Sequence, residues 1–226
     1  MNVESVGKRL RRFSPRLYRL AQPAWWILKR SLPRRNSWNR RKDYAYYQAV
    51  LDLSRKHAPA GASVIDVGAS DTRLVDQLAW FPCRVALDNA YTFPRRGIQR
   101  VRTDFMEFRP AGTFDLVLCL QVIEHQEDPR AFTRKLLATG GIVIISVPYR
   151  WPAGAVASHR EDPVDEAKLR DWAGREPLES LIVQDARQRL ISVYRGDHPP
   201  PATSRQAVDS GCNTQRAAVP TAERVR

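Results

Sequence analysis

The sequence predicts an α/β fold with a doubly wound, mostly parallel sheet that ends in an antiparallel hairpin. Between residues 43 and 147, apolar segments of strand length alternate with segments of helical periodicity. This alternation is typical of parallel strands joined by crossover helices. Two later strand-like segments, 181–183 and 190–194, are separated by only six residues. Because a parallel crossover needs a dozen residues or more, we expect these two strands to form a hairpin.

Charge and periodicity divide the chain into three parts. The net charge is +13, but residues 1–42 hold 13 of the 37 Lys and Arg residues and a single acid, so the remainder is nearly neutral. Residues 196–226 include consecutive prolines and show no periodicity. We therefore predict a basic N-terminal arm over 1–42, one folded domain over 43–195 and a disordered tail over 196–226.

The arm interleaves its basic residues with bulky apolar ones, including Trp25 and Trp26. Three interpretations stay open: a solvated disordered arm, peripheral contact with an anionic membrane surface, or contact with a nucleic-acid backbone, which we favour least. No run of eighteen apolar residues exists, and the early run 24–28 is too short for a signal-peptide core. We expect a cytoplasmic protein that can also lie at the inner face of the membrane.

The first predicted strand, 64–67, runs into a turn of small and polar residues from Gly68 to Thr72. Helical periodicity follows over 74–80, as in a buried strand that ends in a tight turn opening a helix. Ligands of α/β sheets bind at such strand ends, so this turn is the first candidate for a cofactor site. The preceding segment, 43–57, is predicted as a helix with Asp43 as its N-cap.

Four more strands and two helices follow in order. The strands are predicted over 84–87, 99–102, 114–120 and 142–147, and the nearly all-apolar 114–120 is expected to be central. Asp128 and Pro129 predict an N-cap and first residue for a helix that runs to about residue 137. Asp162 and Pro163 predict the start of a second helix, which ends at Gly174.

Three carboxylates stand at the ends of three successive predicted strands: Asp66, Asp88 and Asp104. Asp88 lies 22 residues after Asp66, about the spacing at which an acid meets ribose hydroxyls in dinucleotide-binding folds. Each acid alone is more often a helix cap or a solvated side chain than a ligand-binding group. Their occurrence at three neighbouring strand ends predicts a site for a nucleoside-containing cofactor.

Several motifs in this order resemble the class I S-adenosylmethionine-dependent methyltransferases, over about residues 60–195. They are Val-Ile-Asp-Val-Gly-Ala-Ser-Asp at 64–71, Leu-Asp at 87–88, Thr-Asp-Phe at 103–105, Phe-Asp-Leu-Val-Leu-Cys-Leu-Gln-Val-Ile-Glu-His at 114–125 and Gly-Gly-Ile-Val-Ile-Ile-Ser-Val-Pro at 140–148. The resemblance implies a Rossmann-like sheet of about seven strands with the last one reversed. It also implies S-adenosyl-L-methionine as cofactor.

The resemblance also implies where the cofactor would bind. Asp66 and Gly68 would line its methionine end, Asp88 its ribose, Asp104 and Phe105 its adenine, and Gln121 the loop under the sulfonium, with Ala69, Ser70 and Asn89 completing the set. This chain departs from the family at Ser70 and Thr72, where further glycines are usual. A positive φ at either position would be strained.

Acceptor chemistry is expected around the Glu-His pair and the loop after the fifth strand. His125 is a candidate general base, or a residue that packs on the following helix, and His159 is a second catalytic candidate. Tyr149 and Trp151 are expected either to line the acceptor or to belong to an ordinary surface loop. Glu124 is expected to be structural.

Two subtypes of the family are disfavoured by the residues after the fourth strand. Enzymes that methylate exocyclic base amines resemble one another in an Asn/Asp-Pro-Pro-Tyr/Phe loop, which is absent here. Metal-dependent small-RNA 2′-O-methyltransferases resemble Glu-x-x-Glu-His with a distant His, and Gln121 replaces the first Glu. Because a lost carboxylate weakens a hard-cation site, we expect no metal.

The expected activity is methyl transfer to oxygen or nitrogen of a small or sugar-like acceptor. The run 148–195 is similar to bacterial methyltransferases of surface-glycan or lipid-linked sugar biosynthesis. Two alternatives stay open: an RNA methyltransferase that uses the basic arm, and a membrane-surface or partner-binding protein with a vestigial cofactor site.

Overall fold

The computed structural model describes residues 38–90 and 95–199. Most of the predicted arm and tail lies outside the described residues, so the expectations for them stay predictions. The folded unit begins at Trp38, five residues before the predicted boundary. Trp38 belongs to this unit because its side chain is buried and its ring packs edge-on against Tyr47, with 4.8 Å between centroids.

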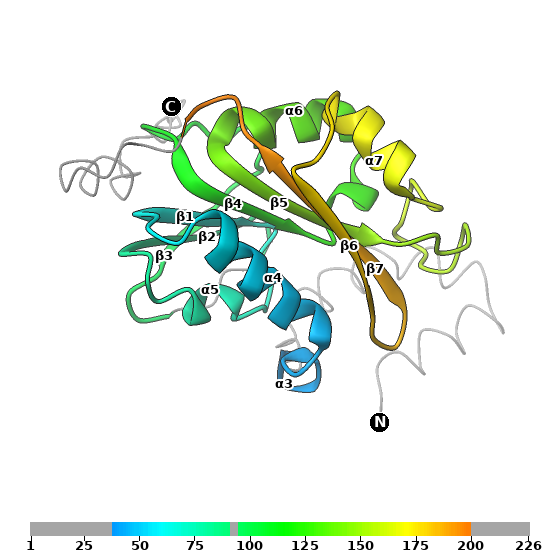
Figure 1. The fold of residues 1–226 in the computed structure, drawn as a ribbon, viewed down its shortest axis with the longest axis horizontal. Helices are drawn as coiled ribbons and strands as arrows, with labels where there is room; N and C mark the ends of the chain where they lie inside the picture. The colour runs from blue at the N-terminus through cyan, green and yellow to red at the C-terminus, as the bar shows by residue number, and fades with distance from the viewer. Residues whose placement is uncertain (1–37, 91–94, 200–226) are drawn as a thin grey trace, which may run out of the picture. The chain divides into compact units, whose positions relative to one another are not determined.

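One sheet of seven strands forms the centre of the fold (Figure 1). Its strands are β1 (Ser63–Val67), β2 (Cys83–Asp88), β3 (Gln99–Arg102), β4 (Phe114–Leu120), β5 (Gly140–Pro148), β6 (Glu179–Gln184) and β7 (Gln188–Arg195). The order across the sheet is β3-β2-β1-β4-β5-β7-β6, and β7 runs in the direction opposite to the other six strands. The predicted parallel strands and the C-terminal hairpin are therefore confirmed.

Helices cover both faces of this sheet (Figure 1). α4 (Ala45–His57) and α5 (Leu74–Gln77) pack on one face, and α6 (Pro129–Thr139) and α7 (Glu166–Ala173) on the other. Alternate side chains of a strand serve the two layers, since Ile65 packs with the α6 and α7 side and Val64 with the α4 side. All residues of β1 and β5 are buried, which explains their continuous apolar runs.

The N-terminus of α4 corrects one prediction. The helix begins at Ala45, and its N-cap residue Tyr44 makes no side-chain capping bond, so Asp43 is not the cap. Asp185 takes that role from the turn between β6 and β7. Its carboxylate accepts hydrogen bonds from the backbone N–H groups of Ala45, at 2.9 Å, and Tyr46, at 3.3 Å. The cap is thus supplied by a residue 140 positions away in the chain.

Two other helices start or end differently from the prediction. α7 begins at Glu166, with Asp165 as the N-cap that accepts from the Lys168 N–H at 2.9 Å, so Asp162 and Pro163 lie before the helix. α5 is a single turn that ends at Gln77, short of the periodic segment 74–80. Pro82 disfavours helical backbone at the preceding residue, which limits how far this helix can extend. The α6 cap is confirmed, since Asp128 accepts from the Ala131 N–H at 2.9 Å.

The segment between β3 and β4 is also simpler than strict strand-helix alternation implies. Residues 103–113 form turns rather than a crossover helix. A short 3-10 helix, η1 (Ile123–His125), follows β4, and a four-residue helix, α3 (Trp38–Arg41), precedes α4. Among the described residues, no helix is long and apolar enough to cross a membrane.

Candidate active site

The turn after β1 is bound to the end of β2. The N–H groups of Gly68 and Ala69 both donate to the Leu87 carbonyl, at 2.8 and 3.0 Å. Gly68 has φ +76°, and a Cβ at this position would overlap the Val122 side chain. Glycine is therefore required both by the backbone conformation and by the close approach of the loop after β4.

Ser70 adopts a positive φ of 46°, so the departure from glycine at this position does place a side chain in strained backbone. Its N–H donates to Asp88 Oδ2 at 3.0 Å, and the Ala90 N–H donates to Asp88 Oδ1 at 2.8 Å. These two bonds orient the Asp88 carboxylate at the end of β2.

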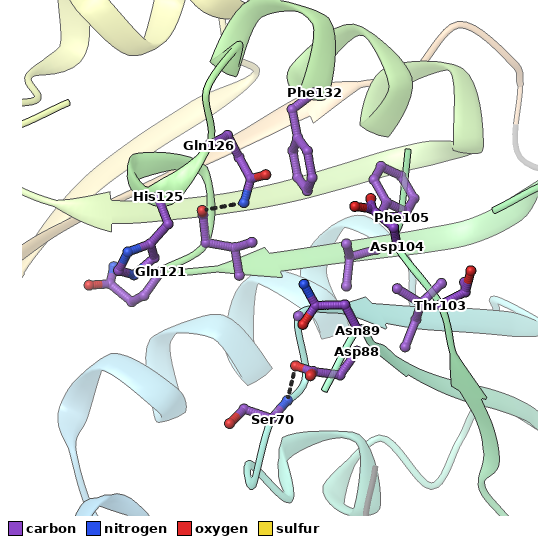
Figure 2. A pocket seen from close by; sticks show the side chains of 14 residues that line it. Ser70, Asp88, Asn89, Thr103, Asp104, Phe105, Gln121, His125, Gln126 and Phe132 are labelled. Carbon is purple, nitrogen blue, oxygen red and sulfur yellow. Dashed lines mark hydrogen bonds between the residues drawn. The ribbon is translucent and has the colours of Figure 1, made fainter. Parts of the chain in front are cut away.

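A cavity of about 320 Å³ opens at these strand ends (Figure 2). Its wall combines backbone and side chains from the ends of β1, β2, β3 and β4 with a ring from α6. The lining residues are Val67, Gly68, Ser70, Leu87, Asp88, Asn89, Thr103, Asp104, Phe105, Gln121, Val122, His125, Gln126 and Phe132. A volume of this size suits a small-molecule ligand. Eight of the residues singled out by sequence motifs thus surround one cavity.

One side of the cavity carries an acid and two aromatic rings. Asp104 accepts from the Met106 N–H through Oδ1 at 2.7 Å, which fixes its carboxylate at the turn after β3. The rings of Phe105 and Phe132 lie 5.1 Å apart between centroids, and Lys135 Nζ lies 5.1 Å from the Phe105 ring centre. This side offers a hydrogen-bond acceptor beside an aromatic surface.

Gln121 and His125 lie on the other side of the cavity, away from Thr103, Asp104 and Phe105 (Figure 2). Gln121 has φ +59°, and its N–H donates to the Ser146 carbonyl at 2.9 Å. Its side-chain Nε2 donates to Ser146 Oγ at 3.3 Å, and Tyr46 Oη lies 2.9 Å from the same hydroxyl. The Gln121 amide is therefore oriented by β5 and α4.

Asp66 and Ala69 do not line the cavity; both are buried beneath the turn. Burial raises the pKa of Asp66 to about 7. Thr72 Oγ1 lies 3.2 Å from Asp66 Oδ2 and 2.9 Å from the Ala69 carbonyl. Because Thr72 has one hydroxyl hydrogen, both contacts are satisfied together when a neutral Asp66 donates to Thr72 and Thr72 donates to the carbonyl.

The two candidate catalytic histidines meet although 34 residues separate them in the chain. Their rings lie 4.7 Å apart between centroids in an edge-to-face arrangement, and His159 stacks on Trp151 at 5.8 Å. Only His125 lines the cavity. Its Nδ1 lies 2.9 Å from the Ser158 carbonyl, and burial lowers the pKa of the imidazole.

Trp151 and Tyr149 do not line the cavity as an acceptor wall. The Trp151 indole N–H donates to the Gln188 carbonyl at 2.8 Å, which ties this residue to the start of β7. The Tyr149 hydroxyl donates to Glu166 at 3.0 Å. These two hydrogen bonds hold the loop against α7 and the hairpin.

Glu124 was expected to be structural, and its role stays a prediction. The residue is fully buried, and neither carboxylate oxygen has a hydrogen-bond partner among the described residues. Burial raises the pKa of Glu124 to about 8.

Several cavity residues were not expected from the sequence. Thr103 and Val122 stand inside recognised motifs but carry no residue-specific signal, and Gln126 follows the Glu-His pair. Phe132 is one apolar position of an amphipathic helix, so its periodicity indicates burial without indicating a ligand. Only the tertiary structure shows that the helix carrying Phe132 faces the strand ends.

Comparisons with known proteins agree with this geometry. A family model described as "Methyltransferase domain" matches residues 38–198. The chain is 32% identical over 182 residues to a ubiquinone biosynthesis O-methyltransferase of Xanthomonas oryzae pv. oryzae (strain PXO99A), covering 66% of this chain and 72% of the relative. A protein of the same name in Xanthomonas axonopodis pv. citri (strain 306) is 33% identical over 117 residues, which span 45% of this chain and about half, 49%, of that relative.

Solved methyltransferase structures share the fold. N-methyltransferase NodS from Bradyrhizobium japonicum WM9, in complex with S-adenosyl-L-homocysteine, superposes with a TM-score of 0.62 at 16% identity, covering 76% of this chain and 98% of that chain. The 1,6-didemethyltoxoflavin-N1-methyltransferase of Burkholderia thailandensis superposes with a TM-score of 0.56 at 17% identity, covering 82% and 91%.

Fold and motifs define the class of this protein as an S-adenosylmethionine-dependent methyltransferase, as the sequence predicted. The chain belongs to the methyltransferase-domain family over residues 38–198. The residues of the cavity fit the cofactor of this class. Two carboxylates oriented by backbone N–H groups stand at adjacent strand ends, and an aromatic surface lies beside the second one.

Proposed function

We propose that this chain transfers a methyl group from S-adenosyl-L-methionine to a hydroxyl oxygen of a small aromatic acceptor. The cofactor, when bound, supplies a methyl group activated by its positively charged sulfur. The relatives support oxygen as the acceptor atom, since those that match over 182 residues are named O-methyltransferases of ubiquinone biosynthesis. That name also supports a ring hydroxyl of the kind that quinone precursors carry.

The cofactor-binding role of each residue follows from what it offers to the cavity. Asp88 stands at the end of β2 as the acceptor for the ribose hydroxyls, with Asn89 beside it, and Asp104 can accept from the adenine amine while Phe105 packs on the ring. The backbone at Gly68 can approach the methionine end closely because it has no side chain. These assignments are the ones that the sequence motifs imply.

The observation that carries the proposal is the state of His125 at the opposite side of the cavity. A carbonyl only accepts hydrogen bonds, so Nδ1 of His125 donates to the Ser158 carbonyl and carries the hydrogen. Nε2 therefore holds a lone pair. An acceptor hydroxyl that reacts with the methyl group must lose its proton, and His125 provides a group at the cavity wall that can take part in this activation.

Cofactor binding is tested by calorimetric titration of S-adenosylmethionine and S-adenosylhomocysteine into the purified chain. We expect Asp88→Ala to lower the affinity at least tenfold, because one lost hydrogen bond to a charged group corresponds to about 1.5–3 kcal/mol. The matched control is Asp171→Ala, an exposed acid on α7 paired with Arg130. Equal affinities for the two variants would contradict the assigned role of Asp88.

The acceptor atom is tested with isotopically labelled methyl donor and two matched aromatic probes, catechol and 1,2-diaminobenzene. They differ only in the atom that would receive the methyl group. Methyl transfer to catechol alone supports the proposal. Transfer to the diamine alone would overturn the assignment of oxygen and leave the methyltransferase class intact.

A further inference from the structure

The two edge strands of the sheet differ in their chemistry. β3 and β6 stand at the two ends of the strand order. β3 spans four residues, and two of them are arginines with exposed side chains. β6 spans six residues, and the sequence from Leu178 to Gln184 contains no Lys, Arg or Pro. Lysine and other charged side chains, prolines and short strands are devices that keep a sheet edge from pairing with another strand. β6 therefore lacks the protection that β3 has.

The hydrogen bonds of β7 show which backbone groups face β6. The Tyr149 N–H donates to the Gln188 carbonyl at 3.1 Å, and the Gly196 N–H donates to the Gly141 carbonyl at 2.8 Å. Both bonds continue the register between β5 and β7, so the even-numbered residues of β7 bond to β5. In an antiparallel strand the N–H and C=O of one residue point to the same side, and successive residues alternate. The odd-numbered residues of β7 therefore bond to β6.

The hairpin register carries this alternation over to β6. Each odd-numbered residue of β6 faces an odd-numbered residue of β7, from Glu179 opposite Val193 to Val183 opposite Arg189. The odd-numbered residues of β6 therefore direct their N–H and C=O groups towards β7. The residues that alternate with them direct these groups away from the sheet, and they are Ser180, Ile182 and Gln184. Among the described residues, no strand lies on that side of β6.

The side chains on these outward-pointing residues are apolar at the centre and polar at the ends. Ile182 is 43% exposed. Ser180 and Gln184 lie two positions before and after it, and both are exposed. The exposed large hydrophobic residues in the described part of the chain are Met106, Leu178 and Ile182, so two of the three lie in or next to β6. An exposed strand edge with an apolar centre favours the addition of another strand.

We propose that β6 pairs with β6 of a second copy of this chain, antiparallel and around a two-fold axis at Ile182. In this register Ile182 faces Ile182 of the second copy and Ser180 faces Gln184, so every outward-pointing residue of β6 gains a partner. A two-fold interface uses the same patch on both copies, and this edge complements itself because apolar meets apolar and polar meets polar. An axis at Leu181 would pair fewer groups, because Gln184 would then face Leu178, whose N–H is already bound within the hairpin.

The charges near this edge are compensated within each copy. Glu179 would face Asp185 of the second copy at both ends of the paired segment, and bare like charges there would disfavour pairing. The Glu179 carboxylate contacts Lys56 at 2.7 Å and His57 at 2.8 Å. The Asp185 carboxylate accepts from the first N–H groups of α4 and lies 3.4 Å from Arg189. The pairing therefore joins two carboxylates that already have cationic or N–H partners.

The pairing is tested by sedimentation equilibrium of the full chain over a range of protein concentrations, where we expect a reversible dimer. Ile182→Pro removes an N–H that points outward and leaves the bonds between β6 and β7 in place. Ile182→Lys places two like charges opposite each other at the axis. Each variant should weaken dimerisation by about tenfold or more. The matched control is Met106→Lys, an exposed apolar position after β3 at the other end of the sheet, which should leave the dimer dissociation constant unchanged.

Amide hydrogen exchange gives a second readout that a general loss of structure would not reproduce. The N–H groups of Ser180, Ile182 and Gln184 should exchange more slowly as the protein concentration rises. Those of Leu181 and Val183 bond to β7 and should be protected at every concentration. Ile182→Lys should abolish the concentration dependence at Ser180 and Gln184 while the protection at Leu181 and Val183 remains.

Three results would overturn the proposal. A chain that stays monomeric at all concentrations has no such interface. A dimer that both Ile182 variants leave unchanged forms through another part of the chain. Association that continues beyond the dimer would contradict a closed two-fold contact. Retention of S-adenosylhomocysteine binding identifies the variants that remain folded, and Ile182→Lys alone decides the outcome if Ile182→Pro does not fold.

Discussion

Replacing Gly68 by alanine tests how the cofactor turn is built. Two separate costs follow from the structure. A non-glycine residue at φ +76° loses about 1–2 kcal/mol from backbone sterics. The new Cβ would also overlap the Val122 side chain, and inserting a methyl group into packed surroundings costs about 1–3 kcal/mol. We expect Gly68→Ala to lower the free energy of unfolding by about 2–5 kcal/mol in urea titrations.

Gly154 offers a matched control for this substitution. It has φ +78°, but no atom lies within 4 Å of the position that a Cβ would take. Gly154→Ala should therefore cost only the backbone part, about 1–2 kcal/mol. The overlap should also push Val122 towards the cavity and weaken S-adenosylhomocysteine binding in calorimetry for Gly68→Ala alone. Adding Val122→Ala to Gly68→Ala should restore part of the affinity. Equal stability losses at the two glycines, with unchanged affinity, would refute this account.

Three further predictions concern the rest of the fold. Asp185→Ala removes the distant cap of α4 and should lower the free energy of unfolding by about 1–2 kcal/mol in urea titrations. Asp43→Ala should change it by less than about 0.5 kcal/mol in the same titrations. A larger loss for Asp43→Ala than for Asp185→Ala would show that Asp43 caps the helix. Asp66 has a raised pKa of about 7 against an ordinary 3.8, so the folded state binds more protons between these values and stability should fall as pH rises from about 4 to 7. Asp66→Asn should flatten this slope, and an unchanged slope would show that Asp66 does not cause it. Trp38→Ala should lower the free energy of unfolding by about 3–5 kcal/mol, because it removes a buried ring. An unchanged stability would show that Trp38 does not belong to the folded unit.

Local pattern was sufficient for most of the sheet. The strands over 99–102 and 114–120 have the predicted bounds. For 114–120 the nearly continuous apolar run is visible without knowledge of the fold, whereas 99–102 reads Gln-Arg-Val-Arg and was placed by the turn residues that follow it. The same holds for the acids at the ends of β2 and β3, since chain order places parallel strand ends at one edge of the sheet. The Asp128 cap was equally visible, because its partner is three residues away.

The sequence by itself therefore determined the sheet, the cofactor edge and the class of enzyme. Only the tertiary structure decided which distant residues complete them: Asp185 caps α4, Arg41 pairs with Asp71 in the cofactor turn at 2.6 Å, and His159 lies against His125. It also decided that Asp66 lies beneath the turn rather than in the cavity. The reason is physical. Capping, ion pairing and ligand clusters depend on contacts between segments far apart in the chain, and no local periodicity encodes those contacts.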